Sequence, residues 1–406
     1  MEDNPVRLNI SPGYPDFLEL PWDKPLSDWS KYYSRVVELP HGLSRHPIEF
    51  INYEGAVYAL KELAKTDAQN EYGNLKTIES LHLPTVIPVG FVLVDSREDA
   101  HSILITQYLD RSLPYRLLFM GQGLERYRTH LLDAMAGLLV QLHLCGIYWG
   151  DCSLSNTLFR RDAGALQAYM VDAETSEVVS DRLPPTLRFH DLEIMEENIN
   201  SELVELQVSG VLKNVKEQIP IADTGGYIRI KYHNLWEEVT RPIVIGIGEN
   251  YRIQEQIRLL NDMGFSVGDV RITPVESGNV LKLSIAVTDR NYHRDQLYGL
   301  TGLFVEEMQA RKIMNEIQEQ NARLSQSNGY DTPLSVAAFH WLENTFKPIT
   351  EQLRNLVNVH TTLAELYCQV LEHKWYLSEK AGHDVGHQLA TEDYIRQFSH
   401  EVVANI

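Results

Sequence analysis

The sequence predicts an α+β protein of two domains. In the first, a small antiparallel sheet precedes a mainly helical lobe; the second is separate and runs from α/β to helical. Between about residues 33 and 110, five strand-like segments occur with one helical segment after the third. Residues 124–145 then form a long amphipathic pattern that ends near Gly146. The composition shifts around residues 220–241, which indicates that a second domain follows.

The five strand-like segments alternate apolar and polar residues and are separated by turn residues. The helical segment at 65–82 carries Leu75, Ile78 and Leu81 at helical spacing, and Pro84 ends it. The strand segments read SRVVELP, HPIEFINYEG, AVYALKEL, PVGFVLVD and SILITQYL. In the second of these, NYEG has the composition of a tight turn, so the second and third segments are expected to pair as a hairpin.

These patterns divide the chain into three parts. Residues 1–32, rich in Pro, Asp and Trp, are expected to form an irregular N-terminal arm laid over a domain. The first domain is expected at 33–210 and the second at 215–406, with mixed α/β structure at 220–290 and helices at 296–406.

The bulk composition limits the classes of partner. The 406 residues include 56 acidic and 36 basic side chains, for a formal net charge of -20. Such a surface repels nucleic acid, although a small pocket with bound Mg²⁺ can still hold an anionic nucleotide. Three cysteines without a CxxC pair, no secretory signal and no long apolar run lead us to expect a cytoplasmic protein without a transmembrane segment.

Four polar motifs occur in one order and at consistent spacing. The segment Val57–Lys61 is an alternating strand that ends in lysine, and Glu71 follows ten residues later in the helical segment. Residues 150–156, GDCSLSN, place Asp151 and Asn156 at Asp-x4-Asn spacing in a loop. Asp172 stands at the end of a later strand, in VDAE. Each motif has a purely structural interpretation, as a solvated lysine or a turn or helix cap. Their shared order favours one site.

Phosphoryl transfer requires these residue types, because the triphosphate must be held, neutralised and aimed at an acceptor hydroxyl. Lys61 is expected to hold the α- and β-phosphates of ATP, with Glu71 fixing its ammonium group. Asn156 and Asp172 supply hard oxygen ligands for Mg²⁺. Asp151 is expected to accept a hydrogen bond from the acceptor hydroxyl and to act as the catalytic base.

Two further segments complete the expected nucleotide site. Gln107, Tyr108 and Leu109 follow a strand and are expected to form the hinge whose backbone meets the adenine. LPHGLSRH at 39–46 is the candidate cover over the phosphates, with Arg45 and His46 as candidate phosphate contacts. This cover has a single glycine, which limits how closely its backbone can approach a phosphate.

The segments HPIEFINYEGAVYALKEL, GIYWGDCSLSNTLF and MVDAE resemble the lipopolysaccharide-kinase (Kdo/WaaP) branch of the protein-kinase-like superfamily, over about residues 33–205. SVAAFHWLENTFKPI and HKWYLSEKAGHDVG resemble the bacterial domain of unknown function 4032. The resemblance implies a two-lobed kinase fold and an ATP site, without naming a substrate.

The sequence departs from the kinase pattern at several positions. Trp149 stands where the family usually has histidine, Ser153 where many protein kinases have lysine, and Ala173 where a phenylalanine is usual. Three interpretations therefore stay open: an atypical kinase that phosphorylates an unidentified hydroxyl acceptor, a pseudokinase-type nucleotide-binding or interaction module, and a protein whose C-terminal domain carries the function.

The C-terminal half contains weaker signals. Residues 246–250, GIGEN, follow a strand, and a plain tight turn is the favoured interpretation. His383 and His387 superficially resemble a zinc motif but are expected to be solvated or capping residues. Helical spacing in MQARKIMNEIQEQNARL indicates a core-packing stripe, with a homodimer contact as the alternative. The aromatic residues of the helical region are expected in its core: Trp341, Phe346, Trp375 and Tyr376.

Overall fold

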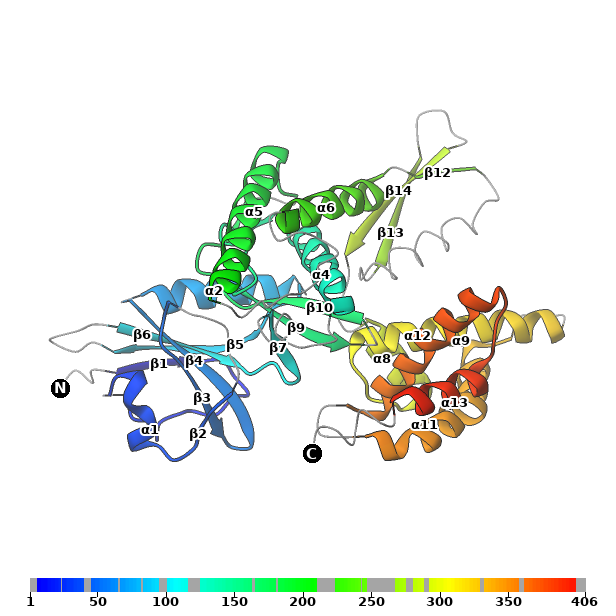
Figure 1. Ribbon diagram of the computed structural model, residues 1–406, viewed down its shortest axis with the longest axis horizontal. Coiled ribbons are helices and arrows are strands. Elements are labelled where there is room, and N and C mark those ends of the chain that lie inside the picture. The colour runs from blue at the N-terminus through cyan, green and yellow to red at the C-terminus, as the bar shows by residue number, and fades with distance from the viewer. Residues whose placement is uncertain are drawn as a thin grey trace. The chain divides into compact units, whose positions relative to one another are not determined.

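Figure 1 shows the computed structural model of the chain as a ribbon. It describes residues 6–398 except 23, 40–44, 65, 82, 95–100, 116–124, 163–164, 180–181, 210–222, 242, 247–266, 275–279, 288–291, 329–331 and 358–360. Two compact units result, one of residues 1–160 and 166–241 and the other of 161–165 and 242–406. The first unit extends beyond the boundary expected at 210–215 because helix α6 (Thr224–Thr240) packs on α4 (Glu125–Leu144) and α5 (Pro185–Val208).

The first unit begins with a six-stranded antiparallel sheet in the order β1-β5-β6-β4-β3-β2. Its strands are β1 (Val6–Ile10), β2 (Val36–Val37), β3 (Ile48–Tyr53), β4 (Ala56–Ala64), β5 (Ile87–Val94) and β6 (His101–Gln107). Strand β1 corrects the expectation of an irregular arm, because its apolar residues alternate and it pairs with β5. The five-residue alternation in VRLNI is short and adjoins a Pro-rich stretch, which obscures it in the sequence.

The rest of the N-terminal segment covers one face of this sheet. It includes a 3-10 turn (Leu26–Asp28) and the short helix α1 (Trp29–Tyr32). Its buried side chains pack against Ile51, Tyr58 and Leu60 of the sheet, and they are Phe17, Leu20, Trp22, Leu26 and Trp29. Burial of these large apolar groups is the main driving force that fixes the segment there.

The opposite face of the sheet receives helix α2 (Asp67–Ser80), which contacts β4, β5 and β6. Side chains alternate between the faces of a strand, so Lys61 points to the face opposite Leu60 and towards α2. The hairpin between β3 and β4 turns at Glu54 and Gly55, whose φ angles are 49° and 86°. Two residues with positive φ form the tight turn that NYEG predicted.

The helical lobe of the first unit is built from α4, α5 and α6 with short strands between them (Figure 1). The strands form a β10-β9-β7 sheet and a β11-β8 pair. Their bounds are β7 (Ser112–Pro114), β8 (Ile147–Tyr148), β9 (Thr157–Asp162), β10 (Ala165–Met170) and β11 (Glu177–Val178). The loop from 149 to 156 lies between β8 and β9, and Asp172 follows β10.

The second unit begins with an antiparallel sheet in the order β12-β14-β13, made of β12 (Ile243–Gly246), β13 (Val267–Pro274) and β14 (Val280–Val287). Residues 247–250 of the GIGEN motif lie outside the described residues. The helices that follow are α8 (Tyr292–Thr301), α9 (Glu307–Asn328), α10 (Leu334–Trp341), α11 (Lys347–Leu353), α12 (Leu363–Ala381) and α13 (His387–Phe398). A π-helical turn (Leu342–Phe346) joins α10 to α11, and a 3-10 turn (Arg354–Leu356) follows α11.

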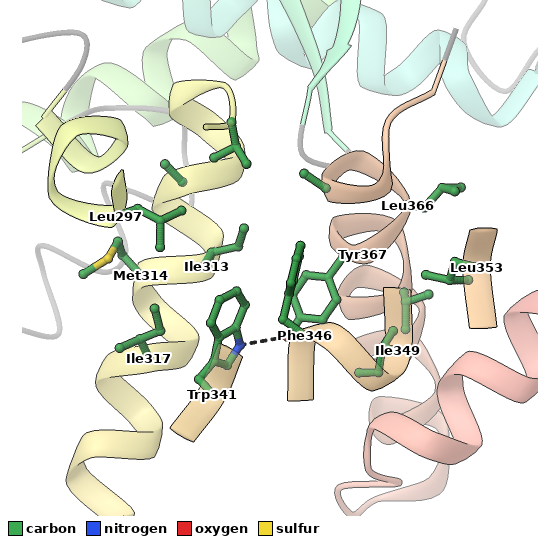
Figure 2. Close-up of a cluster of buried hydrophobic side chains, with 14 of the residues drawn as sticks. Leu297, Ile313, Met314, Ile317, Trp341, Phe346, Ile349, Leu353, Leu366 and Tyr367 are labelled. Carbon is green, nitrogen blue, oxygen red and sulfur yellow. Dashed lines mark hydrogen bonds between the residues drawn. The ribbon is translucent and has the colours of Figure 1, made fainter. Parts of the chain in front are cut away.

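The helices of the second unit share one apolar core, shown in Figure 2. Ile313, Met314 and Ile317 of α9 are buried in it. The stripe behind the homodimer alternative is therefore occupied within the unit. Trp341 and Phe346 are also in the core, as expected, whereas Trp375 and Tyr376 are 65% and 57% exposed, which corrects the expectation for those two. They lie on the face of α12 turned away from this core. Among the described residues, no helix has the length and apolar character needed to cross a membrane.

Candidate functional site

Lys61, Glu71 and Asp172 meet in the first unit. Lys61 Nζ lies 3.0 Å from Glu71 Oε2, 3.2 Å from Glu71 Oε1 and 2.6 Å from Asp172 Oδ2. Strand β4 supplies the lysine, α2 supplies the glutamate and the end of β10 supplies the aspartate. The Glu71 side chain is fully buried and the lysine is 12% exposed. One ammonium group is thus shared by two carboxylates, as the spacing of the motifs predicted for Lys61 and Glu71.

This charge balance shifts two pKa values. Burial and the neighbouring Asp172 carboxylate raise the pKa of Glu71 to about 7, against the opposing effect of Lys61. Burial opposes the charged form of Lys61, but Glu71 and Asp172 outweigh it and raise the lysine pKa. Lys61 therefore keeps its proton, whereas Glu71 is about half protonated near pH 7.

Asp151 and Asn156 lie at the two ends of the loop between β8 and β9. Asn156 Nδ2 donates to the carbonyl of Asp151 at 3.0 Å and to its Oδ2 at 3.1 Å. The other carboxylate oxygen, Oδ1, accepts a hydrogen bond from Asn198 of α5 at 2.9 Å. The Asp-x4-Asn spacing thus closes the loop on itself, and Asn198 adds a contact that the motif did not predict.

Asp191, also in α5, holds the start of this loop. Its two carboxylate oxygens accept the backbone N–H groups of Trp149 and Gly150, each at 2.9 Å. Gly150 has a φ of 79°, and a Cβ there would lie 3.0 Å from the carbonyl oxygen of Thr175. Only glycine adopts this close-packed, left-handed backbone without strain.

Trp149 joins the loop to the segment that carries Asp172. The indole is fully buried, and its Nε1–H donates to the carbonyl of Asp172 at 3.1 Å. Val171 N also donates to the carbonyl of Asn156 at 3.1 Å. The two segments with candidate metal ligands are therefore connected directly. Tryptophan at this position, a departure from the family pattern, supplies a hydrogen bond between them.

Glu202 gives the loop a third contact with α5. Its carboxylate accepts the backbone N–H groups of Leu154 and Ser155, at 2.8 and 3.0 Å. Burial raises the pKa of Glu202 although these bonds oppose the shift. Cys152, beside Asp151, is fully buried, and burial raises the pKa of its thiol well above the usual value. The carbonyl of Cys152 accepts a hydrogen bond from Asn198 at 3.2 Å.

A buried network connects α6 to the same loop. His143 Nε2 lies 3.0 Å from Asp191 Oδ2, and His143 Nδ1 lies 2.8 Å from the Tyr232 hydroxyl. Burial lowers the pKa of His143 despite the adjacent carboxylate, so the ring is neutral at neutral pH. Arg188 donates to the Tyr232 hydroxyl at 3.3 Å, and its guanidinium lies 3.8 Å from the ring centroid of Trp236. Helix α6 is thereby tied to the loop through three hydrogen-bonded side chains.

The expected hinge follows β6. Gln107 is its last residue, pairing with Tyr58 and Ile87 of the neighbouring strands. Tyr108 N donates to the carbonyl of Val57 at 2.9 Å, and Leu109 O accepts from Ser112 N at 3.2 Å. The N–H of Tyr108 is therefore bonded to β4. The prediction that all three hinge residues offer their backbone to the adenine does not hold for this N–H group.

Most of the expected cover, residues 40–44, lies outside the described residues. Arg45 is exposed, and His46 Nε2 lies 3.7 Å from Glu174 Oε2. Glu174 is two residues from Asp172, so His46 lies close to the Asp172 segment, and Glu174 N donates to Asp172 Oδ1 at 3.1 Å.

The donor set is suited to Mg²⁺ bound together with phosphate. The described residues contain no group of three or more His, Cys, Asp or Glu side chains placed for a metal ion. Mg²⁺ sites commonly take one or two carboxylates and complete their shell with phosphate oxygens and water. The carboxylate of Asp172 and the amide oxygen of Asn156, on segments joined by hydrogen bonds, are donors of this kind.

Sequence reasoning missed Asp191, Asn198 and Glu202, which hold the loop from α5. They are spaced at i, i+7 and i+11, so they follow one stripe of the helix. That stripe adjoins the buried residues Leu192 and Ile199. Their position on the same stripe as buried apolar residues could have indicated that these polar side chains face the protein. The Glu-rich composition instead suggests an ordinary solvated helix.

Comparisons with known proteins assign the two halves to two families. Residues 56–215 match the model of the lipopolysaccharide kinase (Kdo/WaaP) family, and residues 234–398 match that of a domain of unknown function, DUF4032. No curated protein matches the chain. Among solved structures, WaaP in complex with acyl carrier protein is similar at 16% identity and a TM-score of 0.34, over 57% of this chain and 100% of that chain. The N-terminal region thus matches a lipopolysaccharide kinase family, and a region that matches DUF4032 follows it.

Proposed function

We propose that the kinase-like unit binds ATP with Mg²⁺ and transfers the γ-phosphoryl group to a hydroxyl acceptor. The observation that carries this proposal is the meeting of Lys61, Glu71 and Asp172, with Asp172 joined through Trp149 to the loop of Asp151. Charged side chains in a buried site are costly unless they are paired, and strongly shifted pKa values gather at functional sites. The kinase family match of residues 56–215 supports the same function.

In this proposal Lys61 holds the α- and β-phosphates while Glu71 fixes its ammonium group. Asp172 and Asn156 hold Mg²⁺, which neutralises the phosphate charge. The adenine meets the backbone at Gln107 and Leu109, because the N–H of Tyr108 already donates to Val57. Arg45 and His46 approach the phosphates from the cover segment, which has too few glycines to bring its own backbone close.

Asp151 is the proposed catalytic base or orienting residue. Asn198 and Asn156 bind its two carboxylate oxygens from opposite sides, which fixes the plane of the carboxylate. A positioned carboxylate accepts the hydrogen bond of an acceptor hydroxyl without reorganising, and such positioning lowers the barrier to in-line attack.

A second function, nucleotide binding without transfer, is favoured by a specific observation. Both oxygens of Asp172 are engaged within the protein, one by Lys61 at 2.6 Å and the other by Glu174 N at 3.1 Å. Mg²⁺ bound at Asp172 would have to share the carboxylate with the ammonium group of Lys61 or exchange with it. A protein that never makes this exchange would bind nucleotide as a regulatory or interaction module.

Nucleotide binding and γ-phosphate release, measured on the full chain, test both functions. ATP with Mg²⁺ should stabilise the wild type by about 2.7 kcal/mol at a hundredfold excess over Kd, and Lys61→Ala should remove this effect. Asp151→Asn should lower the rate of transfer by about 10²- to 10⁴-fold with little change in nucleotide affinity. Asp295→Asn, an exposed aspartate of the other unit, is the matched control. Equal γ-phosphate release by wild type and Asp151→Asn, with binding intact, would establish the non-catalytic function.

A further inference from the structure

The helical part of the second unit contains a cavity of about 240 Å³. It lies between α9, the π-helical turn, α12 and the start of α13, and its walls include Glu316, Arg323, Trp341, Thr345, Lys374 and His387. Ligand pockets in proteins are somewhat larger, at about 300–1,000 Å³ for drug-sized molecules, so this cavity matches a small metabolite. It belongs wholly to the DUF4032 region and uses none of the residues of the kinase-like unit.

The π-helical turn is part of the cavity wall. Thr345 lies within this turn, and Trp341 is the residue immediately before it. A π-helical turn inside a helical segment packs less well than an α-helix, and such turns are found most often at functional sites. Here the wider turn places Thr345 on the cavity while Trp341 stays in the core beside Tyr367 (Figure 2).

Hydrogen bonds within the protein engage both carboxylate oxygens of Glu316. Its Oε1 lies 2.8 Å from His387 Nε2, and its Oε2 accepts hydrogen bonds from the Tyr367 hydroxyl and, at 3.3 Å, from Trp341 Nε1. The hydrogen bond and charge of His387, with Tyr367 and Lys374, outweigh burial and lower the pKa of Glu316. This carboxylate is therefore ionised, and three of its acceptor positions are filled by the protein itself.

Lys374 is in the opposite situation. Its ammonium group lies 3.7 Å from Glu316 Oε1 and 3.9 Å from Asp384 Oδ1, beyond normal hydrogen-bond length. The nearest further acceptor atom is His387 Nε2 at 3.5 Å, which is already bound to Glu316. A lysine side chain that is only 16% exposed thus brings three donors to the cavity wall without a short bond to an acceptor.

Three basic side chains, Lys374, Arg323 and His387, gather near the carboxylates of Glu316 and Asp384, in a protein whose overall charge is -20. A backbone hydrogen bond from Gly386 and the positive charges of Lys374, Arg323 and His387 lower the pKa of nearby Asp384. Arg323 lines the same cavity, and guanidinium groups bind carboxylate and phosphate well. Glu319 also lines the cavity and repels ligands of high negative charge, which disfavours a nucleoside triphosphate.

We propose that this cavity is a binding site for a small metabolite with one carboxylate or phosphate group, held by Lys374 with the support of Arg323 and His387. The anionic group binds the ammonium group of Lys374, whose contacts with His387, Glu316 and Asp384 are long, at 3.5, 3.7 and 3.9 Å. The wall formed by Trp341 and Thr345 contacts the rest of the molecule. The proposal is independent of phosphoryl transfer, because it concerns only the DUF4032 region.

The test uses the full chain with inorganic phosphate and succinate as two separate probes, each against sodium chloride of equal ionic strength. Isothermal titration should show saturable binding of at least one probe to the wild type and to Lys380→Gln, an exposed lysine of the same helix. Lys374→Gln should weaken that binding at least tenfold. Binding of phosphate, of succinate or of both identifies the head group that the site prefers.

Two more variants test whether the probe binds inside this cavity. Thr345→Tyr fills the cavity and leaves every charged group in place, so it should abolish binding even if Lys374→Gln proves unstable. Lys61→Ala removes the phosphate-binding lysine of the kinase-like unit and should leave the response unchanged. The proposal is wrong if neither probe binds, if Lys374→Gln and Lys380→Gln bind alike, or if Lys61→Ala alone removes the signal.

Discussion

The two units each contain a buried charge cluster, and the two clusters have opposite compositions. In the kinase-like unit one ammonium group, of Lys61, is shared by two carboxylates, those of Glu71 and Asp172. In the DUF4032 region one carboxylate, of Glu316, lies beside two basic side chains, those of Lys374 and His387. Lys61 thus has two carboxyl partners, whereas Glu316 has two basic partners, and Asp384 lies 3.9 Å from one of these, Lys374.

The pKa values of the two glutamates show what this difference does. The Glu71 side chain is fully buried and that of Glu316 is 16% exposed. Burial and Asp172 raise the pKa of Glu71 to about 7, whereas His387 and its other partners outweigh burial and lower the pKa of Glu316. The number and charge of the neighbouring groups therefore decide whether the pKa of such a glutamate is raised or lowered. The first cluster is suited to receive a cation and the second to receive an anion.

The largest effect is expected from removing the carboxylate at the centre of the second cluster. Glu316→Ala removes the acceptor of the Tyr367 hydroxyl and of His387, while Trp341 Nε1 keeps its hydrogen bond to that hydroxyl. We expect the DUF4032 region to lose about 3–5 kcal/mol of stability. Hydrogen exchange of α9 and α12 measures this loss, with Gln318→Ala, an exposed position of α9, as the control. If the exchange rates of α9 and α12 did not change, Glu316 would not stabilise the packing of these helices.

A smaller loss is expected when only one donor to Glu316 is removed. Tyr367→Phe keeps the packing of the ring and deletes a hydroxyl that donates to a buried carboxylate. Hydrogen bonds to charged groups contribute about 1.5–3 kcal/mol, and this is the expected loss of stability in the same exchange experiment. A loss as large as that of Glu316→Ala would mean that Tyr367 rather than Glu316 organises the cluster.

The comparison also predicts how nucleotide binding depends on pH. A metal ion at Asp172 favours the charged form of Glu71, so binding lowers the pKa of Glu71 from about 7 and releases a proton. Affinity for ATP with Mg²⁺ should therefore rise up to about tenfold per pH unit below pH 7 and level off above it. Titration calorimetry at several pH values measures the slope, and Glu71→Gln should flatten it. If the affinity of the wild type did not change with pH, ionisation of Glu71 would not be linked to nucleotide binding.

The smallest effect is expected for Glu71 in the absence of nucleotide. Its raised pKa contributes stability that is fully present below pH 4.5 and is lost as the pH rises through about 7. Glu71→Gln keeps the shape and leaves Lys61 paired with Asp172, so its free energy of unfolding near pH 8 should lie within about 1 kcal/mol of the wild type. Thermal unfolding of both proteins at about pH 5.5 and 8 should show the wild type losing more stability over this range.

Motif order in the sequence placed Lys61, Glu71, Asp151, Asn156 and Asp172 in one domain, because each lies at a strand end or on an adjoining helix. Their spacing reflects a local structure that the chain forms over a few residues. The hairpin at Glu54 and Gly55 followed from the same local patterns. The functional roles of these residues stay predictions.

The contacts that hold the loop were beyond reach of the sequence, because they join residues about 40 or more positions apart. Asp191 binds Trp149 and Glu202 binds Leu154 only once α5 packs on the lobe. The cluster around Glu316 is similar, since His387 lies 71 residues away from it. The spacing of His383 and His387 is visible in the sequence. The partner of His387, Glu316, is not, because it is brought close only by helix packing.

Because Cys152 is buried, its reaction with a thiol reagent reports local opening of the protein. A thiol-modifying reagent attacks only an accessible thiolate, and the fully buried Cys152, with its raised pKa, offers neither access nor charge. The residue lies next to Asp151 and its carbonyl is held by Asn198. The rate at which the Cys152 thiol is alkylated in the native protein therefore depends on opening of the segment around Asp151. Each opening transiently disrupts the proposed phosphotransfer site. When the segment recloses faster than the thiol reacts, the alkylation rate measures the fraction of time in which that site is open.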